Sequence, residues 1–545
     1  MKINKHLLFS FVITAGAFLL FVPFIGGVHL FDWDEINFAE SAREMIVSGD
    51  YLNVQINFKP FWEKPPLFIW MQVLSMKLFG VNEFAARFPN AVCGIVTLLV
   101  LFNIGSRLYN EKFGLIWTIT YACSILPFIY FKSGIIDPWF NLFIFLGIHH
   151  FIIYRSNNKA LQVFLSSFFI GLAILAKGPV ALLVFMLTAG IYWIFIRFKK
   201  IISLKHFLIF TVTLSITGGF WFILQLINGN FSIISDFIAY QARLFQTEDA
   251  GHGGFFLYHF TVLLFGVFPA SLFAIQGFFI KKHHHSDNKD YSRWMMILFW
   301  VVLILFTIVR TKIVHYSSLC YFPLTFFAAV LIFGIAEYRF TISKWVVYGM
   351  MSVGTIIFLF VAVLPFLGIC NHRVLLLFTK VDEFTKGILM ADVGWSGFEP
   401  LVSLALLSGL LVFFVLQKKQ KAFQGTIALF ISTGLAVYLT LLTYITKIEQ
   451  YSQGAAIEFF KSLSDKDVYI ETVGYKSYAQ LFYTNKKPPV NLLSYDKEWL
   501  LSGDIDKDAY FACKATSKEA ILKIYPGVNV LYEKNGFVFL KRKHD

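Results

Sequence analysis

Runs of apolar residues long enough to cross a lipid bilayer recur along most of this chain, as far as about residue 447. The hydrocarbon core of a bilayer is about 30 Å thick, and a helix needs about 20 apolar residues to span it. Only 15% of the 545 residues are charged, against about a quarter in soluble domains. The sequence therefore predicts an all-α polytopic membrane protein with about 13 transmembrane helices. The predicted spans are residues 7–27, 84–106, 113–130, 137–154, 160–176, 179–197, 206–227, 257–280, 294–310, 316–336, 345–370, 398–417 and 423–447.

Lys and Arg residues gather in every second loop between these runs, and this bias predicts the orientation. Loops rich in Lys and Arg stay on the cytoplasmic side of a membrane. We therefore expect a cytoplasmic N-terminus, with the first span uncleaved, and a C-terminus on the periplasmic side of the inner membrane. The net charge of +14 follows largely from these loops and from contact with anionic membrane lipids, so it does not indicate a nucleic-acid partner.

Three loops on the predicted outer side are long: 28–83, 228–256 and 371–397. Within the first, apolar residues recur with a helical period over 36–47 and 65–79, which predicts two amphipathic helices at the membrane surface. After residue 447 the charges become frequent and the apolar runs shorten. We therefore predict a transmembrane domain over 1–447 and a small periplasmic α/β domain over 448–545.

Short elements can be placed within the predicted α/β domain. Strands are expected at 467–475, 489–493 and 509–513, and helices at 477–482 and 517–524. A hairpin is expected from 529–533 and 536–541, because the intervening Asn535-Gly536 is a common hairpin turn.

The first outer loop carries charged residues that are rare elsewhere in this acid-poor chain. Asp34 and Glu35 follow the first span directly, and Glu63 and Lys64 lie in a turn before two prolines. A carboxylate here could act as a general base or hold a sugar, and Lys64 could neutralise a phosphate. The alternatives are a helix N-cap for the acids and a lysine that reaches to lipid headgroups.

Further charged residues belong to the predicted outer side. Asp137 begins the fourth predicted span and is followed by Pro138. It could be a catalytic acid, or it could cap the helix, because Asp followed by Pro is a favoured helix start. Basic residues on this side run against the usual bias, so together they suggest a collar around an anionic ligand, although each alone could reach to headgroups. The members of this basic collar are Lys64, Lys132, Lys177, Arg243, Arg310 and Lys312.

Metal-ligand patterns are weak. His252 lies in a glycine-rich outer loop and could bind a divalent metal with Glu63, but two residues do not make a site. The five cysteines have no metal-binding or disulfide spacing, and we interpret all five as packing residues. No cofactor is therefore predicted with certainty, and a divalent metal stays an alternative.

Taken together, the motifs resemble those of GT-C membrane glycosyltransferases, in the group of the aminoarabinose transferase ArnT and the protein O-mannosyltransferases (PMT). The resemblance extends over most of the chain. It consists of Asp34-Glu35, Ala39-Glu-Ser-Ala-Arg-Glu-Met-Ile-Val-Ser-Gly-Asp50, Phe61-Trp-Glu-Lys-Pro-Pro66, Glu83-Phe-Ala-Ala-Arg-Phe88, Asp137-Pro138, Ala176-Lys-Gly-Pro179 and Lys312-Ile-Val-His-Tyr316.

This resemblance implies roles for individual residues. Asp34 matches the first-loop aspartate of the family and Asp137 the acid at the fourth span, with Glu35 as support, so these three are the candidate catalytic residues. Lys64, Arg243, Lys312 and Tyr316 are the candidate ligands of the donor phosphate. Glu63, Lys177 and Arg310 are expected to support the site.

The function implied is transfer of a sugar from a polyprenyl phosphate, in bacteria undecaprenyl phosphate, to an envelope acceptor at the periplasmic face. Closest is the aminoarabinose group, whose acceptor is lipid A. A related glycolipid, or Ser and Thr of exported proteins as in the mannosyltransferases, are alternatives. A lipid-linked sugar flippase is the alternative from another class, but the span pattern shows no repeat of the kind many transporters have. A hydroxyl acceptor would need Asp34 as a base, whereas a phosphate acceptor is already anionic.

Overall fold

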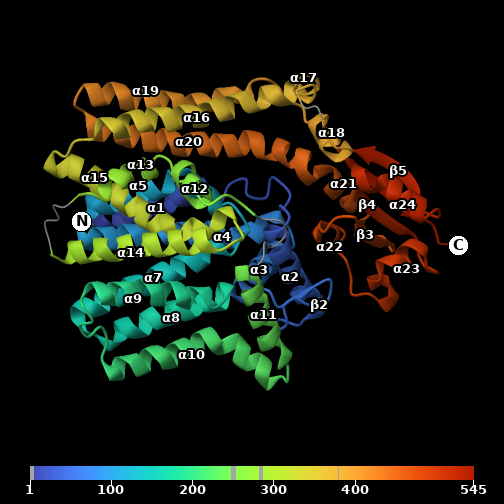
Figure 1. Ribbon diagram of the computed structural model, residues 1–545, viewed down its shortest axis with the longest axis horizontal. Coiled ribbons are helices and arrows are strands. Elements are labelled where there is room, and N and C mark those ends of the chain that lie inside the picture. The colour runs from blue at the N-terminus through green and yellow to red at the C-terminus, as the bar shows by residue number, and fades with distance from the viewer. Residues whose placement is uncertain (1–4, 247–252, 281–285, 378–379, 545) are drawn as a thin grey trace.

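The computed structural model describes residues 5–246, 253–280, 286–377 and 380–544. Most of it is a bundle of helices, with a small sheet at one end (Figure 1). The first half contains α1 (Lys5–Phe21), α2 (Asp34–Ser48), α3 (Leu67–Phe79), α4 (Glu83–Leu108), α5 (Glu111–Ala122), α6 (Ile125–Tyr130), α7 (Asp137–Asn157), α8 (Ala160–Lys177), α9 (Val180–Phe195), α10 (Leu204–Ile227) and α11 (Ser232–Gln246). The short strands β1 (Gln55–Ile56) and β2 (Lys59–Pro60) pair between α2 and α3.

The second half of the bundle follows with α12 (Tyr258–Gly266), α13 (Ala270–Gly277), α14 (Ser286–Ile308), η2 (Val314–Cys320), α15 (Tyr321–Tyr338), α16 (Lys344–Ile369), α17 (Asn371–Leu375), α18 (Glu383–Leu389), η3 (Glu399–Ser403), α19 (Leu404–Lys418) and α20 (Ala422–Glu449). Helices α2, α3 and α11 gather at the end of the bundle that faces the C-terminal sheet, and the N-terminus lies at the opposite end (Figure 1). Helices α2 and α3 belong to the long loop 28–83, and α11 belongs to the long loop 228–256. Both loops and the C-terminal segment were predicted on the same side of the membrane, and in the structure they lie at the same end of the bundle (Figure 1).

Eight helices in the described ranges are long and apolar enough to span a membrane, or nine with one bent pair. The protein is thus a multi-pass membrane protein, but the predicted count of thirteen spans is not confirmed. Two predicted runs explain part of the difference: 113–130 is divided between α5 and α6, and 257–280 is bent by 108° between α12 and α13. Periodicity of apolar residues cannot reveal such breaks, because a bent helix remains apolar.

The C-terminal segment forms a four-stranded sheet in the order β3-β4-β6-β5. Strands β3 and β4 are parallel, and the other neighbours are antiparallel. The strands are β3 (Tyr469–Val473), β4 (Ala509–Lys514), β5 (Asn529–Lys534) and β6 (Phe537–Arg542), and the helices are α21 (Ala455–Ser462), α22 (Ala479–Tyr483), α23 (Lys497–Ser502) and α24 (Lys518–Ile524), with single turns η4 (Gln450–Gly454), η5 (Leu492–Tyr495) and η6 (Ala515–Ser517).

The predicted hairpin is confirmed, because Asn535 and Gly536 take the positive φ angles, 50° and 81°, that a tight turn between β5 and β6 needs. The strand predicted at 489–493 is wrong: η5 occupies part of it, and Pro489 has no N–H group to give to a sheet. The predicted boundary at 447 lies within a helical run that continues from α20 through η4 into α21. The division into domains therefore stays a prediction.

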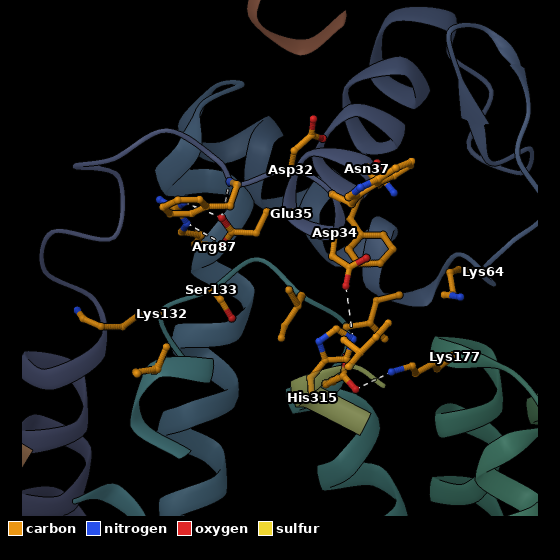
Figure 2. A pocket seen from close by; sticks show the side chains of 18 of the residues that line it. Asp32, Asp34, Glu35, Asn37, Lys64, Arg87, Lys132, Ser133, Lys177 and His315 are labelled. Carbon is orange, nitrogen blue, oxygen red and sulfur yellow. Dashed lines mark hydrogen bonds and ion pairs between the residues drawn. The ribbon is translucent and has the colours of Figure 1, made fainter. Parts of the chain in front are cut away.

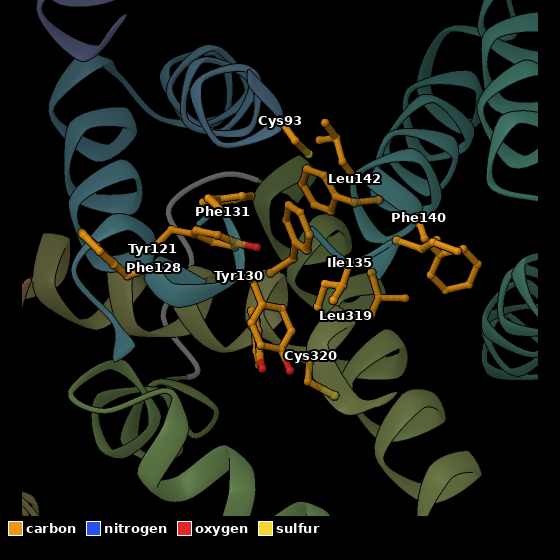
Figure 3. Close-up of a cluster of buried hydrophobic side chains, with 14 of the residues drawn as sticks. Cys93, Tyr121, Phe128, Tyr130, Phe131, Ile135, Phe140, Leu142, Leu319 and Cys320 are labelled. Carbon is orange, nitrogen blue, oxygen red and sulfur yellow. The ribbon is translucent and has the colours of Figure 1, made fainter. Parts of the chain in front are cut away.

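A buried aromatic cluster lies inside the bundle. Phe128 and Phe131 from the α6 region, Tyr121 from α5 and Leu319 from η2 are buried together (Figure 3). Cys93 and Cys320 belong to this cluster, in line with their interpretation as packing residues. That interpretation is wrong for Cys370, which is exposed after α16.

Helix α2 is covered by the tail rather than exposed along a polar face. All of its residues from Glu35 to Met45 are buried, and α22 packs against it. Its charged side chains find partners inside the protein: Arg43 makes a bidentate pair with Glu40, at 2.6 and 2.7 Å. Glu44 accepts the backbone N–H groups of two residues in the β1–β2 turn. Helical periodicity indicated the helix correctly but not the protein layer above it.

A buried ion pair holds the first loop to the bundle. Glu35, on the first turn of α2, makes a bidentate pair with Arg87 of α4, at 2.7 and 2.9 Å. The same guanidinium donates to the backbone carbonyls of Ile25, Val28 and His29. One arginine therefore fixes the chain between α1 and α2.

The tail holds the four residues before α2. Gln453 contacts the backbone of both Leu30 and Asp32, and the backbone N–H of Leu30 donates to the Tyr483 hydroxyl at 2.7 Å. Ser477 donates to the Asp32 carboxylate. The C-terminal segment thus positions the entry into α2, where the acid pair lies.

Replacing Arg87 by Ala should strongly lower the thermal unfolding midpoint of the protein in detergent. The Arg87 and Glu35 side chains are 3% and 7% exposed, and breaking a buried pair costs about 3–5 kcal/mol. The matched control is Lys112→Ala, which breaks an exposed pair with Glu337 (44% and 38% exposed) worth about 0–1 kcal/mol. Equal midpoints for the two variants would contradict the role given to Arg87.

Asp32 should make the protein less stable as the pH rises. Burial raises the pKa of this carboxyl from 3.8 to about 6, although the Ser477 hydroxyl and the Tyr478 backbone lower it. Between these values the folded protein binds more protons here than the unfolded chain, so stability falls from about pH 4 to about pH 6. Asp32→Asn should flatten this part of a plot of unfolding midpoint against pH, whereas the exposed Asp236→Asn should not. An unchanged slope in Asp32→Asn would overturn the assignment.

Candidate functional site

A cavity of about 880 Å³ lies where the first loop, the ends of several helices and the tail meet (Figure 2). Eight of the residues predicted from the sequence line it: Asp34, Glu35, Glu63, Lys64, Asp137, Lys177, Arg243 and Tyr316. They come from segments that are up to 282 residues apart, from Asp34 to Tyr316, so the fold assembles the site from distant parts of the chain. Lys132 of the basic collar also lines this cavity.

A row of ionisable side chains crosses the cavity. The Lys177 ammonium lies 2.6 Å from Oδ1 of Asp137, and Nε2 of His315 lies 3.8 Å from the other oxygen of that carboxylate. The same Nε2 lies 3.5 Å from Oδ2 of Asp34. His315 therefore stands between the two predicted catalytic acids, and Figure 2 shows Asp34 directed toward it.

The helix ends explain why these groups meet. Asp137 is the first residue of α7, where a carboxylate favours the positive end of the helix dipole and Pro138 fits the first turn. Lys177 is the last residue of α8, where a cation is favoured. His315 and Tyr316 are held by η2, whose Ser318 accepts a hydrogen bond from Asn141 of α7 at 2.7 Å.

The two acids differ in their access to the cavity. The Asp137 side chain is only 5% exposed and is paired with Lys177, whereas the Asp34 side chain is 41% exposed. Asp34 is therefore the carboxylate that a ligand in the cavity can reach, and Asp137 can act by holding His315 and Lys177 in place.

Cations and aromatic rings gather on the α11 side of the cavity. Burial and the neighbouring Lys177 lower the pKa of Lys64, whose ammonium lies 5.0 Å from the Tyr240 ring centre. Arg243 contacts the same ring from α11, at 5.1 Å. The Tyr240 hydroxyl donates to Glu63 at 2.9 Å. Lys64, Lys177 and Arg243 therefore make this side of the cavity suited to a phosphate.

Glu35 lines the cavity but is committed to structure. Besides the bidentate pair with Arg87, its oxygens accept the backbone N–H groups of Phe31 and Gly134, at 2.9 and 2.5 Å. Burial alone would raise the pKa of Glu35, but Arg87 and these N–H groups hold it below its usual value. Its geometry is that of a positioning residue for its neighbour Asp34, and it gives no support to a role as a base.

Two predicted residues lie away from the cavity. The Lys312 ammonium is buried and donates to the backbone carbonyls of Phe306, Thr307 and Val309, so it caps the C-terminal end of α14. Arg310 is exposed and does not line the cavity. The structure therefore does not bring these two together with the rest of the collar.

The candidate metal ligands are not brought together. His252 falls outside the described residues, and Glu63 accepts from Tyr240. In the described ranges, no three His, Cys, Asp or Glu side chains group in a way that could hold a metal ion. The metal site stays a prediction.

Sequence reasoning missed several residues of the cavity. His315 lies in the motif Lys312-Ile-Val-His-Tyr316, but nothing in this motif indicates that its side chain contacts Asp34. Tyr240 stands three residues before Arg243, on the same face of α11, and this spacing could have indicated it. Lys476 of the tail also lines the cavity, and nothing in the sequence could have linked it to residues 440 positions away.

Comparison with known proteins begins with a family. The family model described as dolichyl-phosphate-mannose-protein mannosyltransferase matches residues 63–221. This segment contains Glu63, Lys64, Asp137 and Lys177. It covers less than a third of the chain.

Curated relatives extend the match. An undecaprenyl phosphate-alpha-4-amino-4-deoxy-L-arabinose arabinosyl transferase of Pectobacterium carotovorum is 25% identical over 404 residues, which are 71% of this chain and 70% of that protein. Its counterpart in Photorhabdus laumondii is 24% identical over 336 residues, 58% of this chain and 59% of that protein. An uncharacterized protein of Aquifex aeolicus is 24% identical over 295 residues, 53% of this chain and 56% of that protein. The chain thus matches less than two thirds of the length of the last two.

Solved structures match the fold over its full length. The crystal structure of ArnT from Cupriavidus metallidurans bound to undecaprenyl phosphate has a TM-score of 0.77 and 16% identity, and the match covers 98% of both chains. Its apo state gives a TM-score of 0.72, over 99% of this chain and 98% of that one. In family model, curated relatives and fold, this chain therefore resembles the GT-C membrane glycosyltransferases of the ArnT and protein O-mannosyltransferase group.

Proposed function

We propose that this protein is a glycosyltransferase that moves a sugar from undecaprenyl phosphate to lipid A or a related glycolipid. One observation carries the proposal: an accessible carboxylate, Asp34, shares a cavity with the cations Lys64, Lys177 and Arg243. These groups suit transfer of a sugar from a lipid phosphate. The cations stabilise the phosphate that leaves, and the carboxylate orients or deprotonates the acceptor.

The donor phosphate fits the α11 side of the cavity. Lys64 and Arg243 face it from the first loop and α11, and Tyr316 packs under Lys177, with 5.2 Å between the ammonium and the ring centre. Cations that are fixed before the reaction lose little energy in reorganisation, so they can stabilise developing charge strongly. Lys177 is held by Asp137, which keeps its ammonium in place.

The reaction itself exchanges one bond for another. An acceptor oxygen forms a bond to the anomeric carbon, and the bond from that carbon to the phosphate oxygen breaks. Undecaprenyl phosphate leaves with the electron pair. If the acceptor is a hydroxyl, Asp34 takes its proton, and His315 holds that carboxylate toward the cavity. If the acceptor is a phosphate, no proton needs to be removed, and Asp34 acts through its charge and position.

The sugar and acceptor are proposed from the relatives. The curated transferases are named for undecaprenyl phosphate-alpha-4-amino-4-deoxy-L-arabinose, and the resemblance implies lipid A as the acceptor. The Lys and Arg bias supports a cytoplasmic N-terminus and, with it, a cavity that opens on the periplasmic side of the inner membrane.

A second candidate is transfer of mannose to Ser or Thr of exported proteins. It is favoured by the description of the matching family model, which names a protein mannosyltransferase. The two candidates share a site for the donor phosphate and differ in the sugar and in the acceptor.

The test is sugar transfer by the purified protein in nanodiscs. Asp34→Asn and Lys64→Ala should each lower kcat/KM for transfer of aminoarabinose from undecaprenyl phosphate to lipid A by about 10²–10⁴-fold, because one removes the carboxylate and the other a phosphate ligand. Asp236→Asn on α11 is the matched control, since this exposed aspartate lies outside the cavity lining.

Several results would overturn the proposal. Transfer by Asp34→Asn at the wild-type rate would remove the role of the carboxylate. Transfer to Ser or Thr peptides but not to lipid A would favour the second candidate. Movement of the donor across vesicles that contain no acceptor, without any transfer, would indicate a flippase.

A further inference from the structure

Glu44 is a buried acid outside the cavity, and it binds the turn of the hairpin that leads to Lys64. It lies toward the C-terminal end of α2, its side chain is fully buried, and it is not among the residues that line the cavity. Its two carboxyl oxygens accept the backbone N–H groups of Asn57 and Phe58, at 2.6 and 2.7 Å. Any effect of Glu44 on a ligand in the cavity must therefore pass through this turn.

The turn has a backbone shape that its own residues do not favour. Strands β1 and β2 are joined by Asn57 and Phe58, whose φ angles are 58° and 54°. Two-residue hairpin turns with positive φ at both positions are best suited by the pair Asn-Gly. Asn tolerates this conformation, whereas a Phe side chain is crowded against its own backbone there. The turn therefore lacks the glycine that would favour its shape, and contacts from other elements must hold it.

Two elements that are far apart in the sequence make such contacts. Glu44 binds the N–H groups of the turn from α2, and the Tyr495 hydroxyl, from the tail, donates to the backbone carbonyl of Asn57 at 3.0 Å. The Lys59 ammonium also lies over the Tyr495 ring, 3.8 Å from the ring centre. An acceptor for the N–H groups and a donor for the carbonyl together fix the peptide groups of the turn in one orientation.

The first strand of the hairpin is anchored to the bundle, and the second strand is bound to the first. Trp221 and Gln225 of α10 donate to the backbone carbonyl of Leu52, at 2.9 and 3.0 Å. Beyond the paired residues of β1 and β2, the backbone N–H of Phe61 donates to the carbonyl of Val54 at 2.8 Å. The shape of the turn therefore sets how the second strand lies against the anchored one.

Lys64 follows the second strand directly. It lies four residues after the end of β2, and it lines the cavity as a proposed ligand of the donor phosphate. The residue before it, Glu63, accepts from Tyr240 of α11 at 2.9 Å. The segment that carries Lys64 is thus held by α11 on one side and by the hairpin on the other. A binding group that is displaced by about 1 Å can lower the rate of a reaction by about 10²-fold, so the hairpin matters for the function of this lysine.

We propose that Glu44 is a positioning residue for Lys64: it holds the β1–β2 turn in a shape that Asn57 and Phe58 do not favour, and the hairpin then places the Lys64 ammonium for the donor phosphate. The inference rests on the proposed function, because it takes Lys64 as a phosphate ligand. It has a specific consequence. A glycine at position 58 favours the same turn without help, so it should replace the contribution of Glu44. A merely structural role of a buried acid would not be replaced in this way.

The first test measures binding of undecaprenyl phosphate alone to the full chain by native mass spectrometry. Glu44→Leu removes both acceptors and keeps a side chain of similar size, and it should weaken binding by about tenfold. Adding Phe58→Gly should restore the affinity to within about twofold of the wild type. Adding Phe58→Ala is the matched control: it also removes the ring, but Ala is still crowded at positive φ, so it should not restore binding.

A further control shows whether the restoration acts through the turn. Phe58→Gly added to Lys64→Ala should leave binding weak, because the phosphate ligand itself is missing. Three results would overturn the proposal: wild-type affinity in Glu44→Leu, equal restoration by Gly and Ala at position 58, or restoration in the Lys64→Ala background.

The second test separates the two substrates in transfer assays in nanodiscs. Glu44→Leu should raise the donor KM by about tenfold and leave the acceptor KM unchanged, because Lys64 is a ligand of the donor only. Phe58→Gly should return the donor KM of this variant to the wild-type value. An equal rise in both KM values would indicate a general loss of structure and would contradict a role confined to the donor site.

A milder variant covers the case in which Glu44→Leu does not fold. Tyr495→Phe removes one hydroxyl contact with the turn and keeps the ring under Lys59, so the chain should fold normally. It should weaken binding of undecaprenyl phosphate by about threefold, and Phe58→Gly should restore it. Wild-type affinity in Tyr495→Phe would count against a turn that must be held from outside.

Binding and transfer can fail separately. If no sugar is transferred to any acceptor but binding of undecaprenyl phosphate follows the predicted pattern, the proposed function fails and the role of Glu44 stands. If sugar is transferred and Glu44→Leu binds undecaprenyl phosphate as the wild type does, the role of Glu44 fails and the proposed function stands.

Discussion

The buried pair between Glu35 and Arg87 is the interaction on which the site depends. The side chain of Arg87, on α4, binds the carboxylate of Glu35 and three backbone carbonyls in the segment between α1 and α2. Glu35 also accepts from Gly134, which lies between Lys132 and Asp137. This one pair therefore connects the first loop, α4 and the segment before α7. A buried pair of this kind contributes little net stability, but removing one partner is costly because it leaves the other charge buried alone.

The cavity carries more positive than negative charge after these internal pairs are considered. Glu35 is balanced by Arg87, and Asp137 by Lys177. Lys64, Lys132, Arg243 and Lys476 remain against Asp32, Asp34 and Glu63. An anionic ligand, such as the proposed lipid phosphate donor, would restore the balance.

The sequence predicted the charged residues of the site better than the residues that contact them. Asp34, Lys64 and Asp137 could be singled out because charged residues are rare in an apolar chain, and they do share the cavity. Lys312 was grouped with them because it lies on the same predicted side, but it caps α14. The Lys312 ammonium binds the last backbone carbonyls of α14 and therefore does not line the cavity. The sequence pattern alone does not indicate such a contact. His315 was missed for the same reason, since its partners are 281 and 178 residues away.

The fold was predictable in class but not in its breaks and contacts. Apolar runs indicated a helical membrane bundle, and Asn535-Gly536 indicated the hairpin. The bend between α12 and α13, and the cover that the tail gives to α2, depend on packing between distant segments. Lys476 also lines the cavity only because distant segments pack together, so its place there could not be predicted from the sequence.

The most direct test of the account is a structure of the protein in nanodiscs with undecaprenyl phosphate bound. The account predicts that the phosphate oxygens lie within hydrogen-bonding distance, about 3 Å, of Lys64 and Arg243, with Asp34 on the open side of the phosphate. A phosphate found beside Lys132, or outside the cavity, would contradict it.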